Sequence, residues 1–129
     1  MKNILILDAN VILRLILNDN KEMVEKSKNA IKTHKIFIKN EILAEVIYVL
    51  QKVYKVAKLE ICDTLLNFIA IDEVEAESKE FLNCALTAFK NNNVDFVDCL
   101  LYTYNKIAGS EVLTFDKALN ALLESNKLN

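Results

Sequence analysis

The chain has 129 residues, of which 53% are apolar, so it can form a single domain with a substantial core. Its formal net charge of -2 excludes a general electrostatic attraction to nucleic acid, so any such contact has to come from local groups. It contains no proline and one glycine, Gly109, which excludes the glycine-rich loops that cradle phosphates in nucleotide-binding folds.

Apolar runs and helical periodicity predict the elements of the first half of the chain. A short apolar run that ends at an acid predicts a strand over residues 3–7, buried on both faces. Helices are expected over residues 10–17 and 21–33, a strand over residues 35–39, and helices over residues 41–54 and 59–69. Asn40 is expected to cap the helix that follows it.

The second half continues the alternation of strands and helices. A short strand is expected near residues 70–74, then helices over residues 75–90 and 94–108, a strand over residues 111–115 and a final helix over residues 117–124. Gly109 is expected to end the long helix that precedes the last strand. This alternation predicts a parallel sheet covered by helices on both faces, in one α/β domain over residues 1–129.

The cysteines and the histidine do not suggest a zinc site. Cys62, Cys84 and Cys99 lie far apart among apolar residues and are expected to be small buried side chains in a reducing compartment. The one histidine, His34, has no cysteine near it in the sequence. The apolar run over residues 1–7 is too short for a signal peptide, and no stretch reaches the ~18–20 apolar residues of a membrane span. We therefore expect a cytoplasmic protein without a membrane partner.

Four acids stand where an α/β sheet would build a site. Asp8 directly follows the first predicted strand and Asp116 the last, and ligands of parallel sheets bind beyond the carboxyl ends of the strands. Two more acids lie on polar stripes of otherwise apolar helices, Glu45 with Glu41, Tyr48 and Lys52, and Asp98 with Asp95, Tyr102 and Asn105. Carboxylates at positions 45 and 98 are expected to be partly buried, where an unpaired charge is costly and a metal ion would compensate it.

Each acid alone also has an ordinary structural explanation. Asp8 and Asp116 could cap the helices that follow them, and Glu45 could pair with a lysine. Asp98 could be a solvated helix residue, and Asp95 suits the dipole of a helix N-terminus. The conjunction of four acids in one α/β layout favours a shared metal site over four separate explanations.

Four segments closely resemble the PIN-domain ribonucleases, above all the small VapC-type toxins of bacteria and archaea. They are LDANVILRLIL, ILAEVIYVLQKVYK, VDFVDCLLYTYNK and VLTFDKAL, over residues 7–17, 42–55, 94–106 and 112–119. They follow the family's order and together cover essentially the whole chain. The resemblance implies a three-layer PIN-like fold, with a central parallel sheet of about four or five strands flanked by helices.

The resemblance also implies which residues carry the chemistry. Asp8, Glu45, Asp98 and Asp116 correspond to the family's acidic quartet, with Asp8, Asp98 and Asp116 as ligands of Mg²⁺ or Mn²⁺, which prefer hard oxygen donors. Three further residues are expected to support these ligands rather than bind the metal, namely Asn10, Thr114 and Asp95. Arg14 and Lys52 are basic side chains that could position substrate phosphates.

The implied function is that of a metal-dependent ribonuclease acting as the toxin of a type II toxin–antitoxin pair. A small antitoxin with a basic tail would inhibit it, and family members commonly form homodimers. The alternatives are a PIN nuclease of RNA processing and a non-catalytic PIN-like binding scaffold. A haloacid-dehalogenase-type hydrolase would want an acid two residues after Asp8, where this chain has Asn10.

Overall fold

The computed structural model describes residues 3–127, so both ends of the predicted domain, residues 1–2 and 128–129, lie outside the described residues. The chain divides into two compact units, residues 1–79 and 80–129, which are described in turn. No helix of residues 3–127 is both long enough and apolar enough to span a bilayer.

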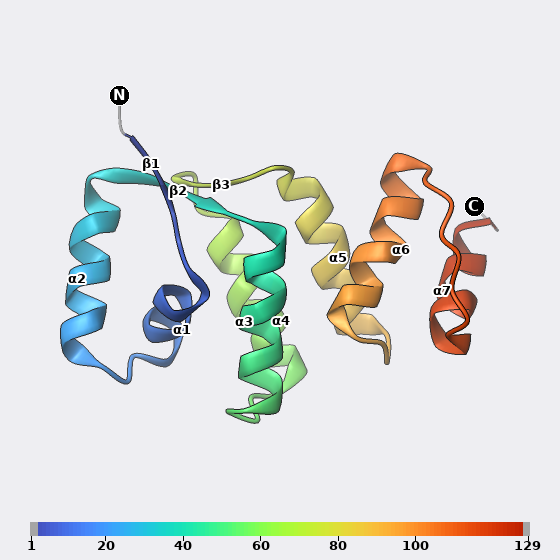
Figure 1. The fold of residues 1–129 in the computed structure, drawn as a ribbon, viewed down its shortest axis with the longest axis horizontal. Helices are drawn as coiled ribbons and strands as arrows, with labels where there is room; N and C mark the ends of the chain where they lie inside the picture. The colour runs from blue at the N-terminus through green and yellow to red at the C-terminus, as the bar shows by residue number, and fades with distance from the viewer. Residues whose placement is uncertain (1–2, 128–129) are drawn as a thin grey trace. The chain divides into compact units, whose positions relative to one another are not determined.

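The first unit is a three-stranded parallel sheet with four helices (Figure 1). In chain order it contains β1 (Asn3–Ile6), α1 (Ala9–Leu17), α2 (Lys21–Lys32), β2 (His34–Ile38), α3 (Asn40–Lys52), α4 (Lys58–Ile69) and β3 (Val74–Ala76). The strands pair in the order β1-β2-β3, with Ile6 opposite Phe37 and Ile36 opposite Val74. The expected α/β class with a parallel sheet is confirmed.

The core of this unit lies between the sheet and its helices. α1 packs against α2 and α3, and α4 packs against α3 and β3. The helices bury one apolar face each, and the largest side chains that are fully enclosed in this unit are Ile12, Ile36, Ile38, Leu43, Ile47, Leu50, Ile61, Leu65 and Ile69. β1 is an edge strand, and its Ile4 and Ile6 remain 61% and 60% exposed, so the expectation that the first strand is buried on both faces is wrong.

The second unit is helical within the described residues. It contains α5 (Lys79–Asn91, of which Lys79 falls in the first unit), α6 (Phe96–Ala108) and α7 (Lys117–Lys127). Phe89 meets Phe96 edge-on with ring centroids 5.7 Å apart, and Phe81 meets Tyr104 at 4.6 Å. α6 ends as expected at Gly109, whose φ of 71° is left-handed.

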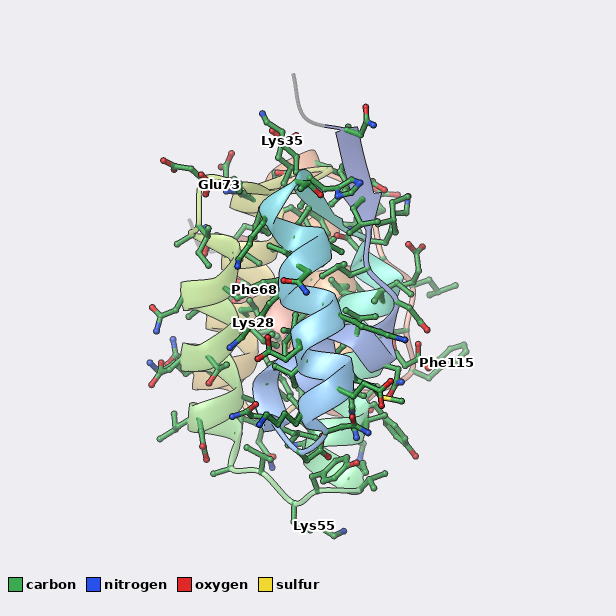
Figure 2. The ribbon with its side chains drawn as sticks, turned by 90° about the vertical axis from the view of Figure 1, so that its left-hand side faces the viewer. Lys28, Lys35, Lys55, Phe68, Glu73 and Phe115 are labelled. Atoms are coloured by element: carbon green, nitrogen blue, oxygen red, sulfur yellow. The ribbon has the colours of Figure 1, made fainter. Side chains whose placement is uncertain are left out.

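Two predicted strands differ from the observed ones. β3 lies at Val74–Ala76 rather than near residues 70–74, and α5 therefore begins at Lys79 instead of residue 75. Residues 111–115 were expected to form a strand, but this segment is extended without joining a ladder, so the described sheet has three strands rather than four or five. Phe115 in this segment is 94% exposed and points away from the ribbon (Figure 2).

Candidate functional site

Asp8 lies where the sequence rule places it, two residues beyond the end of β1. It is the N-cap residue of α1 through its backbone, because its carbonyl oxygen accepts from the N–H groups of Val11 and Ile12 at 3.1 and 3.3 Å. Its side chain makes no capping hydrogen bond and is exposed. The capping explanation for the Asp8 carboxylate is therefore not supported, and its oxygens face solvent at the carboxyl end of the sheet.

The neighbouring strand ends beside Asp8. In the parallel pair β1–β2, Ile6 lies opposite Phe37. Two residues further along each chain segment, Lys39 therefore lies level with Asp8. Asn40 follows Lys39 directly. Asn40 does not cap α3 as expected, because Lys39 is the N-cap residue. The Asn40 side chain instead has its Oδ1 atom buried without a hydrogen-bond partner. The ammonium of Lys39 turns to Glu77, with 3.1 Å between Nζ and Oε1.

Glu45 lies on the outer face of α3. All four residues of the predicted polar stripe are exposed, namely Glu41, Glu45, Tyr48 and Lys52. The expectation that Glu45 is partly buried is wrong, because α3 packs through its opposite face. No hydrogen bond or ion pair within residues 3–127 engages the Glu45 carboxylate, so the lysine partner considered for it is not found.

The side chain of Arg14 makes hydrogen bonds within the first unit. Its Nη1 donates to Oδ2 of Asp19 at 2.8 Å, its Nη2 donates to the hydroxyl of Tyr54 at 3.1 Å, and its Nε is buried without a partner. The Tyr54 hydroxyl, followed by Asp19, raises the pKa of the guanidinium. These contacts tie α1 to the residues after α3. Asn10, the predicted supporting residue, is exposed on α1.

Asp98 is the half-buried acid of the second unit, as expected. Burial raises its pKa most, and the nearby charges of Asp116 and then Asp95 raise it further. Asp95 is the N-cap residue of α6 without a side-chain capping bond, and Asp98 lies in the first turn. Asp116 and Asp95 are thus close enough to Asp98 to act on it electrostatically. The predicted stripe of α6 is only partly exposed, because Tyr102 is buried.

Asp116 and Thr114 form one local arrangement. Oδ1 of Asp116 accepts from the N–H of Leu119 at 2.8 Å, so Asp116 does cap the start of α7. The hydroxyl of Thr114 accepts from the backbone N–H of Asp116 at 3.1 Å, and the Thr114 carbonyl accepts from the amide of Asn120 at 2.9 Å. Thr114 therefore fixes the backbone that carries Asp116, and the second Asp116 oxygen stays available to another partner.

The four predicted acids divide equally between the units. Asp8 and Glu45 belong to the first unit, and Asp98 and Asp116 belong to the second. Within residues 3–127 no three His, Cys, Asp or Glu side chains are close enough together to hold a metal ion. What the structure brings together is the pair Asp98 and Asp116, with Asp95 as a third charge.

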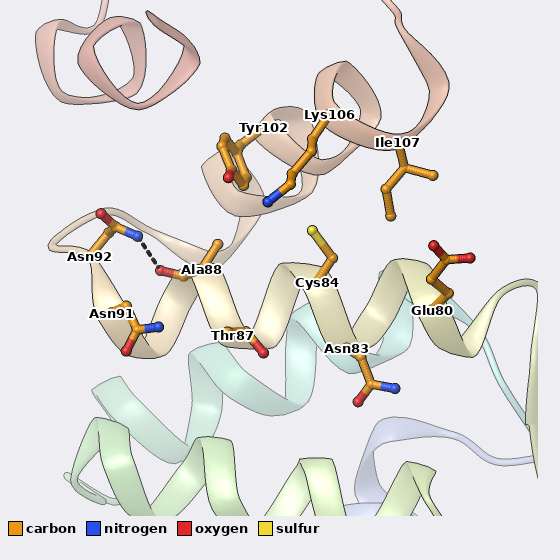
Figure 3. Close-up of a pocket in the computed structure, with 10 residues that line it drawn as sticks. All are labelled: Glu80, Asn83, Cys84, Thr87, Ala88, Asn91, Asn92, Tyr102, Lys106 and Ile107. Atoms are coloured by element: carbon orange, nitrogen blue, oxygen red, sulfur yellow. Dashed lines mark hydrogen bonds between the residues drawn. The ribbon is translucent and has the colours of Figure 1, made fainter. Parts of the chain in front are cut away.

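A pocket of about 500 Å³ lies between α5 and α6 (Figure 3). Tyr102 and Lys106 point into it from α6, and half-buried Cys84 points toward them from α5. The remaining wall consists of Glu80, Ile107 and amide or small side chains, and none of the four predicted acids lines it. Cys62 and Cys99 are buried as expected, whereas Cys84 lies in this pocket wall.

Asn40 is the residue that the sequence interpretation missed as a site candidate. The signal was present, because Asn40 directly follows the second predicted strand, at the same end of the sheet as Asp8. A capping role seemed sufficient for an asparagine at that position, and only the orphaned Oδ1 shows that this role is not filled.

The sequence model described as the PIN domain matches residues 5–122 of the chain. This match runs through both units and includes all four predicted acids. No curated protein and no solved structure matches the chain.

Proposed function

Because the chain belongs to the PIN domain family, whose members are generally nucleases that need divalent metal ions, we propose that it hydrolyses RNA phosphodiester bonds. The proposed catalytic groups are the carboxylates of Asp8, Glu45, Asp98 and Asp116. We further propose that it is the toxin of a type II toxin–antitoxin pair and acts in the cytoplasm.

One observation supports the assignment of Asp98 and Asp116. The pKa of Asp98 is raised by its burial and by the charges of Asp116 and Asp95, so the fold keeps carboxylates together that repel one another. No lysine or arginine salt bridge in the described part of the chain involves Asp98 or Asp116. Clustered, uncompensated acids of this kind are typical of functional sites.

The donor set fits Mg²⁺ or Mn²⁺. Both ions prefer hard oxygen ligands, and Mg²⁺ is commonly held by one or two carboxylates while keeping several waters. Within the second unit, Asp98 and the free oxygen of Asp116 supply two such groups. When bound, the ion would lower the pKa of a water and neutralise charge on the phosphate oxygens.

The chain's own residues have distinct tasks in this mechanism. Asp8, Asp98 and Asp116 would hold the ion, and Thr114 would keep Asp116 in place through the bond that its hydroxyl accepts. Glu45, exposed and unpaired on α3, would orient the attacking water and accept its proton. Lys52 would contact the phosphate backbone, whereas the bonds of Arg14 to Asp19 and Tyr54 leave it less able to do so.

The test is RNA cleavage by the purified protein with Mg²⁺ or Mn²⁺, with and without a chelator. Asp98→Asn should lower the rate by orders of magnitude, because it removes a ligand of the metal ion that would stabilise negative charge in the transition state. Asp95→Asn is the matched control on the same helix and should cost much less. Cleavage that survives exhaustive chelation would refute the metal mechanism, and a larger loss in Asp95→Asn would exchange the roles of the two acids.

The toxin role has its own test. A group of carboxylates favours an arginine or lysine from the tail of a small antitoxin, since charge-assisted hydrogen bonds are the stronger ones. Expression of this chain should arrest growth, and both Asp8→Asn and co-expression of the antitoxin should relieve the arrest. Normal growth with abundant folded protein would favour a PIN nuclease of RNA processing. Absence of both cleavage and arrest would favour a non-catalytic scaffold.

We also propose that the protein forms a homodimer. Sedimentation of the purified protein would reveal its oligomeric state.

A further inference from the structure

Tyr48 stands out among the four tyrosines of the chain. It is 62% exposed, and within residues 3–127 no hydrogen bond or ring contact engages it. The other three each contact a neighbouring side chain, Tyr54 with Arg14, Tyr102 with Lys106, and Tyr104 with Phe81. The fold of the first unit therefore does not use the ring of Tyr48.

Two charged side chains lie next to the exposed ring of Tyr48 on α3. On the outer face of α3, Glu45 precedes it by three residues and Lys52 follows it by four, so both are its neighbours on the helix surface. Lys52 is exposed and has no acid partner in the described chain. At roughly 1.5 Å per residue, Lys52 lies about 6 Å further along the helix axis than Tyr48.

An aromatic face beside an unpaired cation suits one nucleotide of a flexible strand. Base stacking on an aromatic side chain stabilises binding by about 1–3 kcal/mol, and a nearby lysine binds the phosphate. Stacking requires an exposed base face, which single-stranded RNA offers and a duplex interior does not. With a net charge of only -2, the chain lacks the general basic surface that would hold a duplex by its backbone.

We propose that Tyr48 and Lys52 form a subsite for single-stranded RNA, with a base stacked on Tyr48 and its phosphate on Lys52. This inference rests on the proposed function, because it makes Glu45 the neighbouring catalytic group. It assigns the residues that would hold one nucleotide of the strand on the outer face of α3. A protein segment that covers Tyr48 is the competing occupant, and it would not need Lys52.

The experiment measures binding of a labelled single-stranded oligoribonucleotide by fluorescence anisotropy in EDTA, where no metal-dependent cleavage occurs. Tyr48→Ala should weaken binding about 5- to 150-fold, whereas Tyr48→Phe should retain it. Lys52→Ala should reduce the slope of log K against log salt by about 0.7. The controls are Leu59→Ala, which removes another exposed apolar side chain, and Lys28→Ala on α2, and both should bind like the wild type.

The same RNA annealed to its complement should bind more weakly than the single strand and should be insensitive to Tyr48→Ala. Equal binding by Tyr48→Ala and the wild type would overturn the inference, as would undetectable binding by the wild type. Unchanged RNA binding together with an altered oligomeric state would assign Tyr48 to a protein interface instead. Binding without cleavage in Mg²⁺ or Mn²⁺ would refute the nuclease and leave the subsite standing, so the two failures are distinguishable.

Discussion

At the scale of single residues, the half-buried carboxylate of Asp98 is expected to lower the stability of the fold. Burial, Asp116 and Asp95 raise its pKa above the ordinary 3.8, so its ionised form is less favourable in the folded chain than in the unfolded chain. Asp98→Asn should therefore increase the free energy of unfolding of the metal-free protein at pH 7. Below about pH 3.8 the Asp98 carboxyl is neutral in both the folded and the unfolded chain. The gain in unfolding free energy should therefore vanish as the pH falls through the raised pKa toward that value.

Urea unfolding in EDTA between pH 3 and 8 measures this difference. Asp95→Asn is the control, because exposed Asp95 should give a smaller gain. A gain for Asp98→Asn that persists unchanged at pH 3 would show that packing, rather than charge, is responsible.

Two asparagines near helix starts give a second residue-scale prediction. Oδ1 of Asn20 accepts from the N–H of Met23 at 3.0 Å and caps α2, whereas Oδ1 of Asn40 is buried without a partner. Asn20→Ala should cost about 1 kcal/mol. Asn40→Ala should cost nothing or stabilise, because it removes an unsatisfied buried acceptor. Chemical denaturation of both variants checks this, and equal losses would mean that Asn40 has a partner in solution.

The positions of Asp8 beyond the first strand and of half-buried Asp98 in a helix were predictable, because strand ends and helix turns follow local rules. The predicted partial burial of Glu45 was wrong, since burial depends on which face of α3 packs inward. The predicted capping by Asn40 was wrong, since it depends on which side chain reaches the helix N-terminus. Those are properties of tertiary packing, and a single sequence does not encode them in any spacing.

At the scale of elements, the alternation of a strand-like segment is easier to predict than the neighbouring strand with which it would pair. Residues 111–115 alternate as a strand does, with Val112 and Thr114 half-buried and Leu113 and Phe115 exposed. Alternation predicts the pleat, but no local signal specifies the neighbour that completes a ladder. β1 and β2 were placed to within one residue, because their runs of Ile, Leu and Phe are bounded by polar residues.

Two residues with positive φ after helices give predictions of opposite sign for the free energy of unfolding. Gly109 has a φ of 71° with nothing within 4 Å of an added Cβ, so Gly109→Ala should cost about 1 kcal/mol from backbone strain alone. Lys55, exposed and pointing outward after α3 (Figure 2), has a φ of 56°, so Lys55→Gly should stabilise by up to about 1 kcal/mol. Thermal unfolding of the two variants compares them, and a loss in Lys55→Gly would contradict the strain argument.

At the scale of the whole molecule, the single domain over residues 1–129 stays a prediction that cooperativity can test. The family match over residues 5–122 leads us to expect one unfolding transition, with circular dichroism and tyrosine fluorescence changing together. Residues 80–129 alone should be largely unfolded, because a chain of that size buries too little surface to be stable. Two separate transitions, or a helical and cooperatively melting fragment, would instead establish two independent domains.

The equal division of the proposed acids between the two units also matters while the chain is being made. A ribosome completes the sheet and the segments bearing Asp8 and Glu45 before it adds Asp98 and Asp116. At about 5–20 residues per second, the interval from residue 79 to residue 116 lasts a few seconds. During that interval, a nascent or prematurely terminated chain carries only half of the proposed quartet. The ribosome that makes such a nuclease is therefore not exposed to a chain with all four acids until synthesis has almost reached the last helix.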